Sequence, residues 1–288
     1  MKETKIYKIK NNCSIGADIY YQGKDSPIII YIHGGGLILG TRSWFSLEQI
    51  EYFLKFGFSI VNIDYRLAPE TKIGAIIEDI RDAIEWVRTK AIEWYDFDIS
   101  NIAVMGSSAG GYLSLLAGTF DNRLKAIVSL YGYGDILGEW YSKPSEIVCK
   151  EPIIDKSTAN KFVGKREISE GEEARNAFYI YCCQQGVLLK EVTGLDLLNN
   201  KKEMIQYNPI DRITAEYPPT LFLHGDRDRD VPYEQSVKMY EKLKEKGVAT
   251  KLITITGGDH VFDGNFSNQI VQNAFTDIIN FLKAFMCK

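Results

Sequence analysis

Residues 102–110 read Ile-Ala-Val-Met-Gly-Ser-Ser-Ala-Gly, an apolar run that leads into a serine flanked by glycines. The helix-forming residues 111–117 follow directly. A strand, a G-x-S-x-G pentapeptide and a helix in this order predict a nucleophile elbow, a tight turn that strains the central serine and points its hydroxyl outward. The register of that turn selects Ser108 rather than Ser107 as the nucleophile. Because chance produces this pentapeptide in about one such chain in ten, the prediction depends on what else the chain supplies.

Length and composition limit the classes of protein. A chain of 288 residues with 45% hydrophobic and 25% charged residues is ordinary for a globular protein, and we expect a single α/β domain over residues 1–288. The net charge of −4 and the absence of a basic cluster argue against nucleic acid as a partner. No apolar run reaches the roughly 20 residues of a membrane span, and the N-terminus lacks the apolar core of a signal peptide.

The cysteines indicate the compartment. Their number is odd and their spacing is not that of metal ligands, so we expect free thiols in a reducing cytoplasm. The adjacent pair at 182–183 is interpreted as helix packing rather than as a redox pair. The five are Cys13, Cys149, Cys182, Cys183 and Cys287.

Predicted strands alternate with predicted helices along most of the chain. The strands are expected at 4–10, 14–21, 28–32, 59–63, 102–105, 124–130, 220–223 and 252–255, and the helices at 47–56, 73–87, 111–117, 232–246 and 270–285. Repeated strand–helix units favour a mostly parallel central sheet with helices on both faces. Catalytic groups in such a fold lie at the carboxyl ends of the strands.

All three histidines follow predicted strands. His260, after the last strand, is the expected general base, because an imidazole with a pKa near 6.5 can accept the serine proton and return it. His33 opens the sequence His33–Gly36, whose glycines let backbone N–H groups approach an oxyanion. His33 itself and His224 are interpreted as residues that brace their loops.

Four motifs in fixed order extend the pattern. They are His33–Gly36, Asp64–Glu70, Gly106–Gly111 and His224–Pro232. Together they resemble the α/β-hydrolase fold, in its hormone-sensitive-lipase-like esterase branch, over nearly the whole chain except about 134–208. The resemblance implies Ser108 as the nucleophile, Asp228 as the acid and His260 as the base, in the chain order of this fold. It also implies an oxyanion hole made by the amides of Gly35, Gly36 and Ala109.

The acid has alternatives, because further carboxylates lie near Asp228 in the sequence. Asp230 is the second choice; otherwise Asp226 and Asp230 are expected to face solvent or to pair with Arg227 and Arg229. Asp259 adjoins His260, a position from which a carboxylate seldom reaches the same imidazole. The segment Asp64–Glu70 is interpreted as structural, supporting the His33–Gly36 loop through buried Asp64 or Arg66.

The segment at about 134–208 breaks the strand–helix alternation and is expected to be an inserted helical cap. Since His33 lies near the start of the chain, a lid is expected to come from this segment, in which residues 171–184 look helical. Its aromatic residues either line an acyl or alcohol pocket or pack the cap onto the sheet. The residues that bind substrate therefore stay open. These aromatics are Trp140, Tyr141, Phe162, Phe178, Tyr179 and Tyr181.

The expected activity is that of a serine hydrolase, a carboxylesterase that cleaves small neutral acyl esters with no metal or organic cofactor. Two other functions stay open: a peptidase or amidase of the prolyl-oligopeptidase-like type acting on small amides, and a non-catalytic small-molecule receptor on a hydrolase scaffold. The residues allow a homodimer without indicating which surface would form it.

Overall fold

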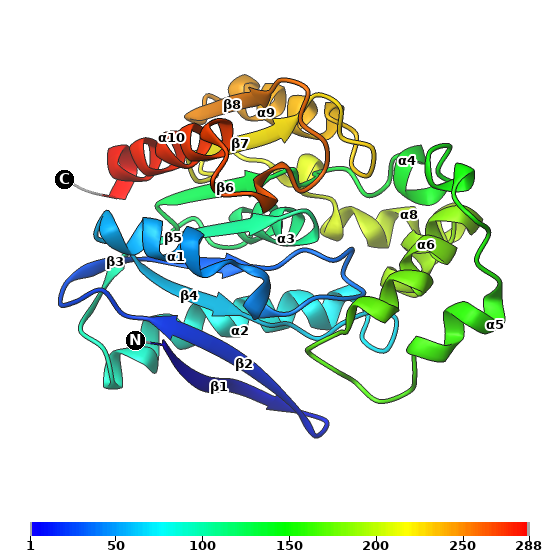
Figure 1. The fold of residues 1–288 in the computed structure, drawn as a ribbon, viewed down its shortest axis with the longest axis horizontal. Helices are drawn as coiled ribbons and strands as arrows, with labels where there is room; N and C mark the ends of the chain where they lie inside the picture. The colour runs from blue at the N-terminus through cyan, green and yellow to red at the C-terminus, as the bar shows by residue number, and fades with distance from the viewer. Residues whose placement is uncertain (1, 287–288) are drawn as a thin grey trace.

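An eight-stranded sheet runs through the molecule, in the strand order β1-β2-β4-β3-β5-β6-β7-β8 (Figure 1). The computed structural model describes residues 2–286. The strands are β1 (Lys2–Lys10), β2 (Cys13–Tyr20), β3 (Ser26–Ile32), β4 (Ser59–Ile63), β5 (Phe97–Ser107), β6 (Ala126–Leu130), β7 (Thr220–Gly225) and β8 (Thr250–Ile255). In this sheet order, the neighbouring strands from β4 through β3 to β8 are parallel. Strands β1 and β2 form an antiparallel hairpin, and β2 pairs antiparallel with β4. The edge strand β1 carries a register shift between Ile6 and Lys8.

The central strand β3 is covered on both faces, as its run of isoleucines predicts. Ile28, Ile30 and Ile32 pack into the hydrophobic core on one face of the sheet. Ile29 and Tyr31 pack into the core on the opposite face. Alternate side chains of a strand point to opposite faces, so an unbroken apolar run is stable only where both faces are covered.

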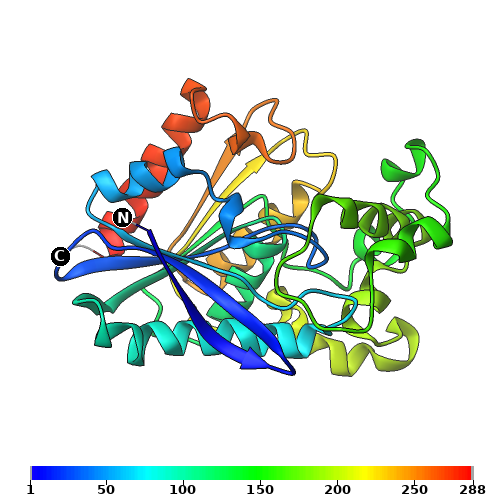
Figure 2. The same cartoon turned by 60° about the horizontal axis from the view of Figure 1, so that its bottom comes forward.

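Helices form a layer on each face of the sheet (Figures 1 and 2). One layer holds α1 (Leu47–Lys55) and α10 (Gln269–Met286), which share a core cluster with β3. The other holds α2 (Ile73–Thr89), α3 (Ala109–Gly118) and α9 (Glu234–Glu245). This arrangement confirms the predicted fold class. No helix among residues 2–286 has both the length and the apolar character needed to cross a membrane.

The chain between β6 and β7 forms a separate group of short helices, which we call the cap (Figures 1 and 2). It lies beyond the carboxyl ends of the parallel strands, in green in both views. Its α-helices are α4 (Glu139–Ser142), α5 (Lys156–Ala159), α6 (Asn176–Gln185), α7 (Leu188–Thr193) and α8 (Leu197–Met204). Four-residue helices cannot sustain themselves alone, so the cap depends on contacts with the rest of the molecule.

Single 3₁₀ turns complete the secondary structure. They lie at Arg42–Trp44, Ala91–Glu93, Val148–Lys150, Asn160–Phe162, Glu173–Arg175, Ile205–Tyr207, Pro209–Arg212 and Phe262–Gly264. The turn at Glu173–Arg175 leads into α6, near the predicted helical segment 171–184. Its buried Arg175 is the main polar anchor of the cap, because the guanidinium pairs with Glu70 and donates to the carbonyls of Ile38 and Ala68.

Most predicted boundaries lie within two residues of the observed ones, and the start of β5 differs most. Strand β5 starts at Phe97 instead of residue 102, because Phe97 pairs with Ser26 of β3 before a register shift. Strand β6 begins at Ala126 instead of residue 124. The cysteines at 13, 149, 182 and 183 are free thiols, and the pair at 182–183 is buried on α6; Cys287 lies outside the described residues.

Candidate active site

The turn between β5 and α3 has the strained geometry that the sequence predicts. Ser108 has φ 52° and ψ −118°, a backbone conformation rare for residues with a side chain. Its backbone N–H donates to the carbonyl of Leu130 on β6 at 2.9 Å. A Cβ atom at Gly106 would collide with the backbone of Gly110, and one at Gly110 would collide with the carbonyl of Ile32. Gly106 is therefore required within the turn itself, and Gly110 where the turn passes against β3.

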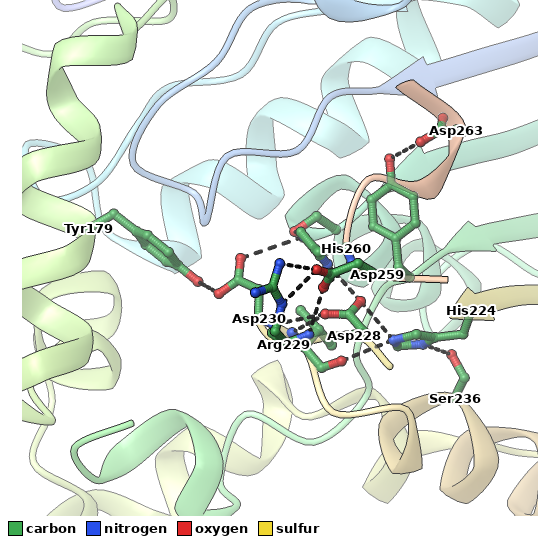
Figure 3. Close-up of polar contacts among 12 residues, drawn as sticks. Tyr179, His224, Asp228, Arg229, Asp230, Ser236, Asp259, His260 and Asp263 are labelled. Carbon is green, nitrogen blue, oxygen red and sulfur yellow. Dashed lines mark hydrogen bonds and ion pairs between the residues drawn. The ribbon is translucent and has the colours of Figure 1, made fainter. Parts of the chain in front are cut away.

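Three side chains from separate loops form a hydrogen-bonded chain at the carboxyl ends of the strands. The Ser108 hydroxyl lies 3.1 Å from Nε2 of His260. On the other side of the ring, Nδ1 donates to Oδ2 of Asp228 at 2.7 Å (Figure 3). Burial alone would lower the pKa of His260. The hydrogen bond to Asp228 and the nearby charges of Asp230 and Asp263 outweigh burial, so the pKa is raised.

Both carboxylate oxygens of Asp228 accept hydrogen bonds. Its Oδ1 accepts from the backbone N–H groups of Asp230 at 2.9 Å and Val231 at 2.8 Å. Its Oδ2 accepts from both His260 and His224, the latter at 3.1 Å. Burial alone would raise the pKa of this carboxyl. The hydrogen bonds from His224 and His260 outweigh burial, so the pKa lies well below its usual range. Asp228 is thus a fully buried anion in a fixed orientation.

His224 makes a contact that sequence reasoning missed. The ring is fully buried, its Nδ1 lies 2.7 Å from the hydroxyl of Ser236, and its Nε2 faces both Asp228 and the carbonyl of Val231 at 3.0 Å. Since both partners of Nε2 are acceptors, Nε2 carries the proton and Nδ1 accepts from Ser236. The chain of contacts therefore runs from Ser236 through His224 and Asp228 to His260 (Figure 3). The only sequence signal was a histidine four residues before the acid.

The other nearby carboxylates have distinct partners, and one expectation was wrong. Asp226 accepts from the N–H of Gly257. Asp259 pairs with Arg229 and does not contact the His260 ring, although it accepts from the His260 backbone N–H. Asp230 neither turns away to solvent nor pairs with an arginine. It faces His260 and accepts from the Tyr179 hydroxyl, while its neighbour Arg229 pairs with Asp259.

The loop after β3 lies against Ser108 and lines the same cavity as Ser108. Gly35 and Gly36 have φ values of 97° and 61°, in the left-handed region that favours glycine. A Cβ atom at Gly34 would lie 3.2 Å from Cβ of Ser108, which shows how close the loop comes to the nucleophile. Among residues 2–286, no group accepts a hydrogen bond from the N–H of Gly35, Gly36 or Ala109. These are the three donors that the sequence predicts for an oxyanion.

The contacts that brace this loop differ in part from the prediction. The Tyr65 hydroxyl donates to the carbonyls of His33 and Gly34 at 3.0 and 3.2 Å, and its ring stacks on His33. Asp64 instead accepts from the N–H of Arg42, further along the same segment, and Arg66 forms a buried pair with Asp79 of α2. Of the side chains of Asp64, Tyr65 and Arg66, it is therefore that of Tyr65 that supports the loop directly.

The three histidines make different contacts in the structure. His33 is fully buried, with Nδ1 2.8 Å from the carbonyl of Gly34, and burial lowers its pKa to about 4. It is therefore neutral near pH 7 and lies within the loop, as expected for a bracing residue. His224 contacts the acid, and only His260 reaches Ser108.

A cavity of about 300 Å³ opens at Ser108. Its walls include Leu39, Trp44 and, from the cap, Asn176 and Tyr179. Tyr179 is the one member of the predicted aromatic set that lines this cavity, and a Cβ atom at Gly36 would meet its ring. Phe178 and Tyr141, by contrast, are buried in the core, which supports the packing interpretation for them.

Part of the cavity lining is polar. The hydroxyls of Ser107 and Tyr31 lie 2.9 Å apart, and Tyr131 donates to Asp263 at 2.7 Å. The second oxygen of Asp263 accepts from the side-chain amide of Gln49 at 3.1 Å. Among the described residues, no three His, Cys, Asp or Glu side chains are grouped so that they could hold a metal ion.

The chain is similar in sequence to two curated proteins over most of its length. Non-reducing polyketide synthase ausA of Emericella nidulans is 27% identical over 341 residues, covering 98% of this chain and 14% of the synthase. Esterase LipC of Mycobacterium tuberculosis is 27% identical over 256 residues, covering 83% of this chain and 54% of LipC. The chain thus spans about one seventh of the synthase and about half of LipC.

The fold also matches a solved structure. The crystal structure of an α/β hydrolase superfamily protein from Enterococcus faecalis has a TM-score of 0.78 at 23% identity, with 99% of both chains covered. The family model BD-FAE matches residues 17–243, which hold the loop after β3, the elbow and the loop after β7. The resemblance that the motifs indicate is confirmed, and the chain belongs to the BD-FAE family of esterase-like α/β hydrolases.

Proposed function

We propose that the protein is a serine carboxylesterase that cleaves small neutral acyl esters through an acyl-enzyme on Ser108. The observation that carries this proposal is the hydrogen-bonded chain from Ser108 through His260 to Asp228. Nucleophile, base and acid must be in mutual contact for acyl transfer, and here each contact is made by the required atom. The similarity to esterase LipC supports the same activity.

In the acylation step, the Ser108 oxygen attacks the ester carbonyl while Nε2 of His260 takes the hydroxyl proton. Asp228 stabilises the imidazolium that forms, because its Oδ2 accepts from Nδ1. The N–H groups of Gly35, Gly36 and Ala109 donate to the developing oxyanion. His260 then gives its proton to the alcohol oxygen as the bond from carbonyl carbon to that oxygen breaks.

Deacylation repeats the sequence with water in place of the serine. His260 takes a proton from the water as the water oxygen attacks the acyl carbon, and Ser108 receives the proton when its ester bond breaks. The acid leaves as the second product. No step requires a group beyond the side chains and amides already described.

Ser108→Ala tests the nucleophile. We expect hydrolysis of p-nitrophenyl acetate to fall by at least about 10³-fold, as when other enzymes of this mechanism lose their nucleophile. A fluorophosphonate probe should label the native protein but not this variant, and the neighbouring Ser107→Ala variant should still be labelled. Thermal unfolding shows whether each variant is folded. Full activity in a folded Ser108→Ala protein would rule out the proposal, and absence of labelling in the native protein would favour a receptor.

The size of the cavity predicts the acyl length. A volume of about 300 Å³ is at the small end of ligand sites, so p-nitrophenyl esters with two to four acyl carbons should be the best substrates. A series from acetate to long-chain esters measures this directly. A maximum at long chains would contradict the small acyl site while leaving the nucleophile assignment intact.

A matched ester and anilide of the same short acid separate esterase from amidase activity. The esterase proposal expects the ester to be turned over much faster than the anilide under the same conditions. Comparable kcat/KM values for the two would instead support an amidase that uses the same residues.

A further inference from the structure

A second carboxylate lies beside the reactive nitrogen of His260. Oδ2 of Asp230 is 3.6 Å from Nε2, the same nitrogen that contacts Ser108. Its Oδ1 accepts from the hydroxyl of Tyr179 at 2.7 Å, so the cap holds the carboxylate in this position (Figure 3). Asp228, on the opposite edge of the ring, already accepts the hydrogen bond from Nδ1. The contacts among Ser108, His260 and Asp228 therefore do not explain why Asp230 lies here.

Asp230 has an oxygen that faces the cavity without a hydrogen-bond donor. Among residues 2–286, no group donates a hydrogen bond to Oδ2, and the side chain is 31% exposed. The other carboxylate of the cavity, Asp263, differs in that Tyr131 and Gln49 supply donors to both of its oxygens. Asp230 is thus the carboxylate whose charge is available to a bound molecule.

No positive side chain balances this charge within the cavity. The described residues that line it include Asp230 and Asp263 but neither lysine nor arginine. The adjacent Arg229 pairs with Asp259 on the exposed side of the loop. A cavity lined by charge of one sign favours ligands of the opposite sign.

The position of Asp230 identifies which part of an ester it would meet. His260 delivers its proton from Nε2 to the alcohol oxygen, so that oxygen must lie within hydrogen-bond reach of Nε2. Since Asp230 is 3.6 Å from the same nitrogen, it borders the alcohol part of the substrate. A positive charge a few bonds beyond the alcohol oxygen could approach both this carboxylate and the face of the Tyr179 ring.

We propose that the enzyme selects esters whose alcohol carries a positive charge, such as an ammonium or quaternary ammonium alcohol, and that Asp230 is the residue that selects them. This inference rests on the proposed esterase function and concerns the alcohol, leaving the small neutral acyl group unchanged. Tyr179 positions Asp230, because its hydroxyl donates to Oδ1 and leaves Oδ2 directed at the cavity.

Three acetate esters test the proposal at one fixed pH where His260 is neutral. Acetylcholine carries the cation, 3,3-dimethylbutyl acetate has the same shape without charge, and 3-acetoxypropanoate carries an anion. We expect kcat/KM for the cationic ester to exceed that for the neutral one by about fivefold, with the anionic ester slowest, as for one partly exposed ion pair. The preference should shrink as salt is added.

Three variants locate the effect. Asp230→Asn keeps the size of the side chain and should bring the cationic-to-neutral ratio close to one. Asp277→Asn makes the same change in net charge at a surface pair with Lys251 and should keep the native ratio. Tyr179→Phe, which retains the ring but loses the hydroxyl, should lower the ratio in part. Thermal unfolding confirms that each protein is folded.

The outcomes separate the two proposals. A native ratio near one, or the same high ratio in Asp230→Asn, overturns the selection by charge while the esterase function stands. A native protein that hydrolyses none of the three esters and also fails with p-nitrophenyl acetate overturns the esterase function, and the inference with it.

Discussion

The loops at the carboxyl ends of the strands and the cap above them are built in different ways. In the loops, each reactive group has several fixed partners: Asp228 has four donors, and Tyr65 binds two carbonyls of the glycine loop. The cap consists of short helices and reaches the catalytic residues mainly through Tyr179. Under the proposed function, the contrast predicts that substitutions in the loops slow the reaction and that substitutions in the cap change which substrate is used.

Asp228→Asn should show the largest effect of the loop substitutions. The backbone N–H groups of Asp230 and Val231 require an acceptor, so the amide oxygen will turn toward them and the NH₂ group will face the two histidines. His260 must then present an unprotonated Nδ1, the wrong tautomer for a base at Nε2. We expect kcat to fall by about 10⁴-fold. Asp226→Asn on the same loop is the control, and comparable losses in both variants would contradict this role.

Substitutions of Gly35 and Gly36 should distinguish contacts within the loop from contacts between the loop and the cap. Either Gly35→Ala or Gly36→Ala should lower kcat by about 10²–10³-fold, the usual effect of a lost oxyanion donor. At Gly35 the added Cβ meets the backbone of Leu39, whereas at Gly36 it meets the Tyr179 ring.

Adding Tyr179→Ala should therefore restore part of the activity of Gly36→Ala and none of that of Gly35→Ala. Steady-state kinetics with p-nitrophenyl acetate measure both pairs. Equal rescue of the two glycine variants would mean that the cap contacts the loop more broadly than the structure describes.

His224→Leu should have an intermediate effect, because it removes a donor from Asp228 without touching the substrate. We expect kcat to fall about tenfold with little change in KM, consistent with loss of one hydrogen bond to a charged group. His224→Gln can still donate to Oδ2 and should recover part of the loss. Ser236→Ala should have a smaller effect, since it only removes the contact that fixes the tautomer. A change in thermal stability without a change in kcat would show that His224 only supports the loop.

The pH profile should show the smallest effect. Catalysis needs neutral His260, and the raised pKa of this residue moves the acid limb of kcat/KM above its ordinary position near pH 6.5. Asp230 favours the charged imidazolium, so Asp230→Asn should lower the pKa of His260 and move the limb to lower pH. Asp277→Asn should leave the limb in place. A shift toward higher pH in Asp230→Asn would contradict the charge interaction.

The parts that could be predicted from the sequence are those determined by local geometry. The turn around Ser108 requires glycines because a Cβ atom would collide there, and the loop at Gly35 and Gly36 requires positive φ. Both requirements are visible in the sequence as glycines. His260 follows a strand, and parallel strands bring their carboxyl ends together. The fold class followed from the same alternation of strands and helices.

The remaining features depend on long-range packing. Tyr179 is one of several similar aromatics, and nothing near it in the sequence distinguishes it from the buried Phe178. Asp230, the second choice for the acid, was otherwise expected to face solvent or to pair with an arginine. The sequence does not show that Arg229 pairs with Asp259, thirty residues away. The contact of His224 with Asp228 likewise depends on Ser236, which comes from the following helix α9.

The register shift in β1 has a consequence for association between molecules. An unpaired strand at the border of a sheet is a template on which another chain can add, and this leads to aggregation. In β1 the shift at Ile6 and Lys8 interrupts the regular ladder, and four lysines in nine residues place charge along it. Both features oppose strand addition, so this border of the sheet is poorly suited to a continuous sheet between two copies.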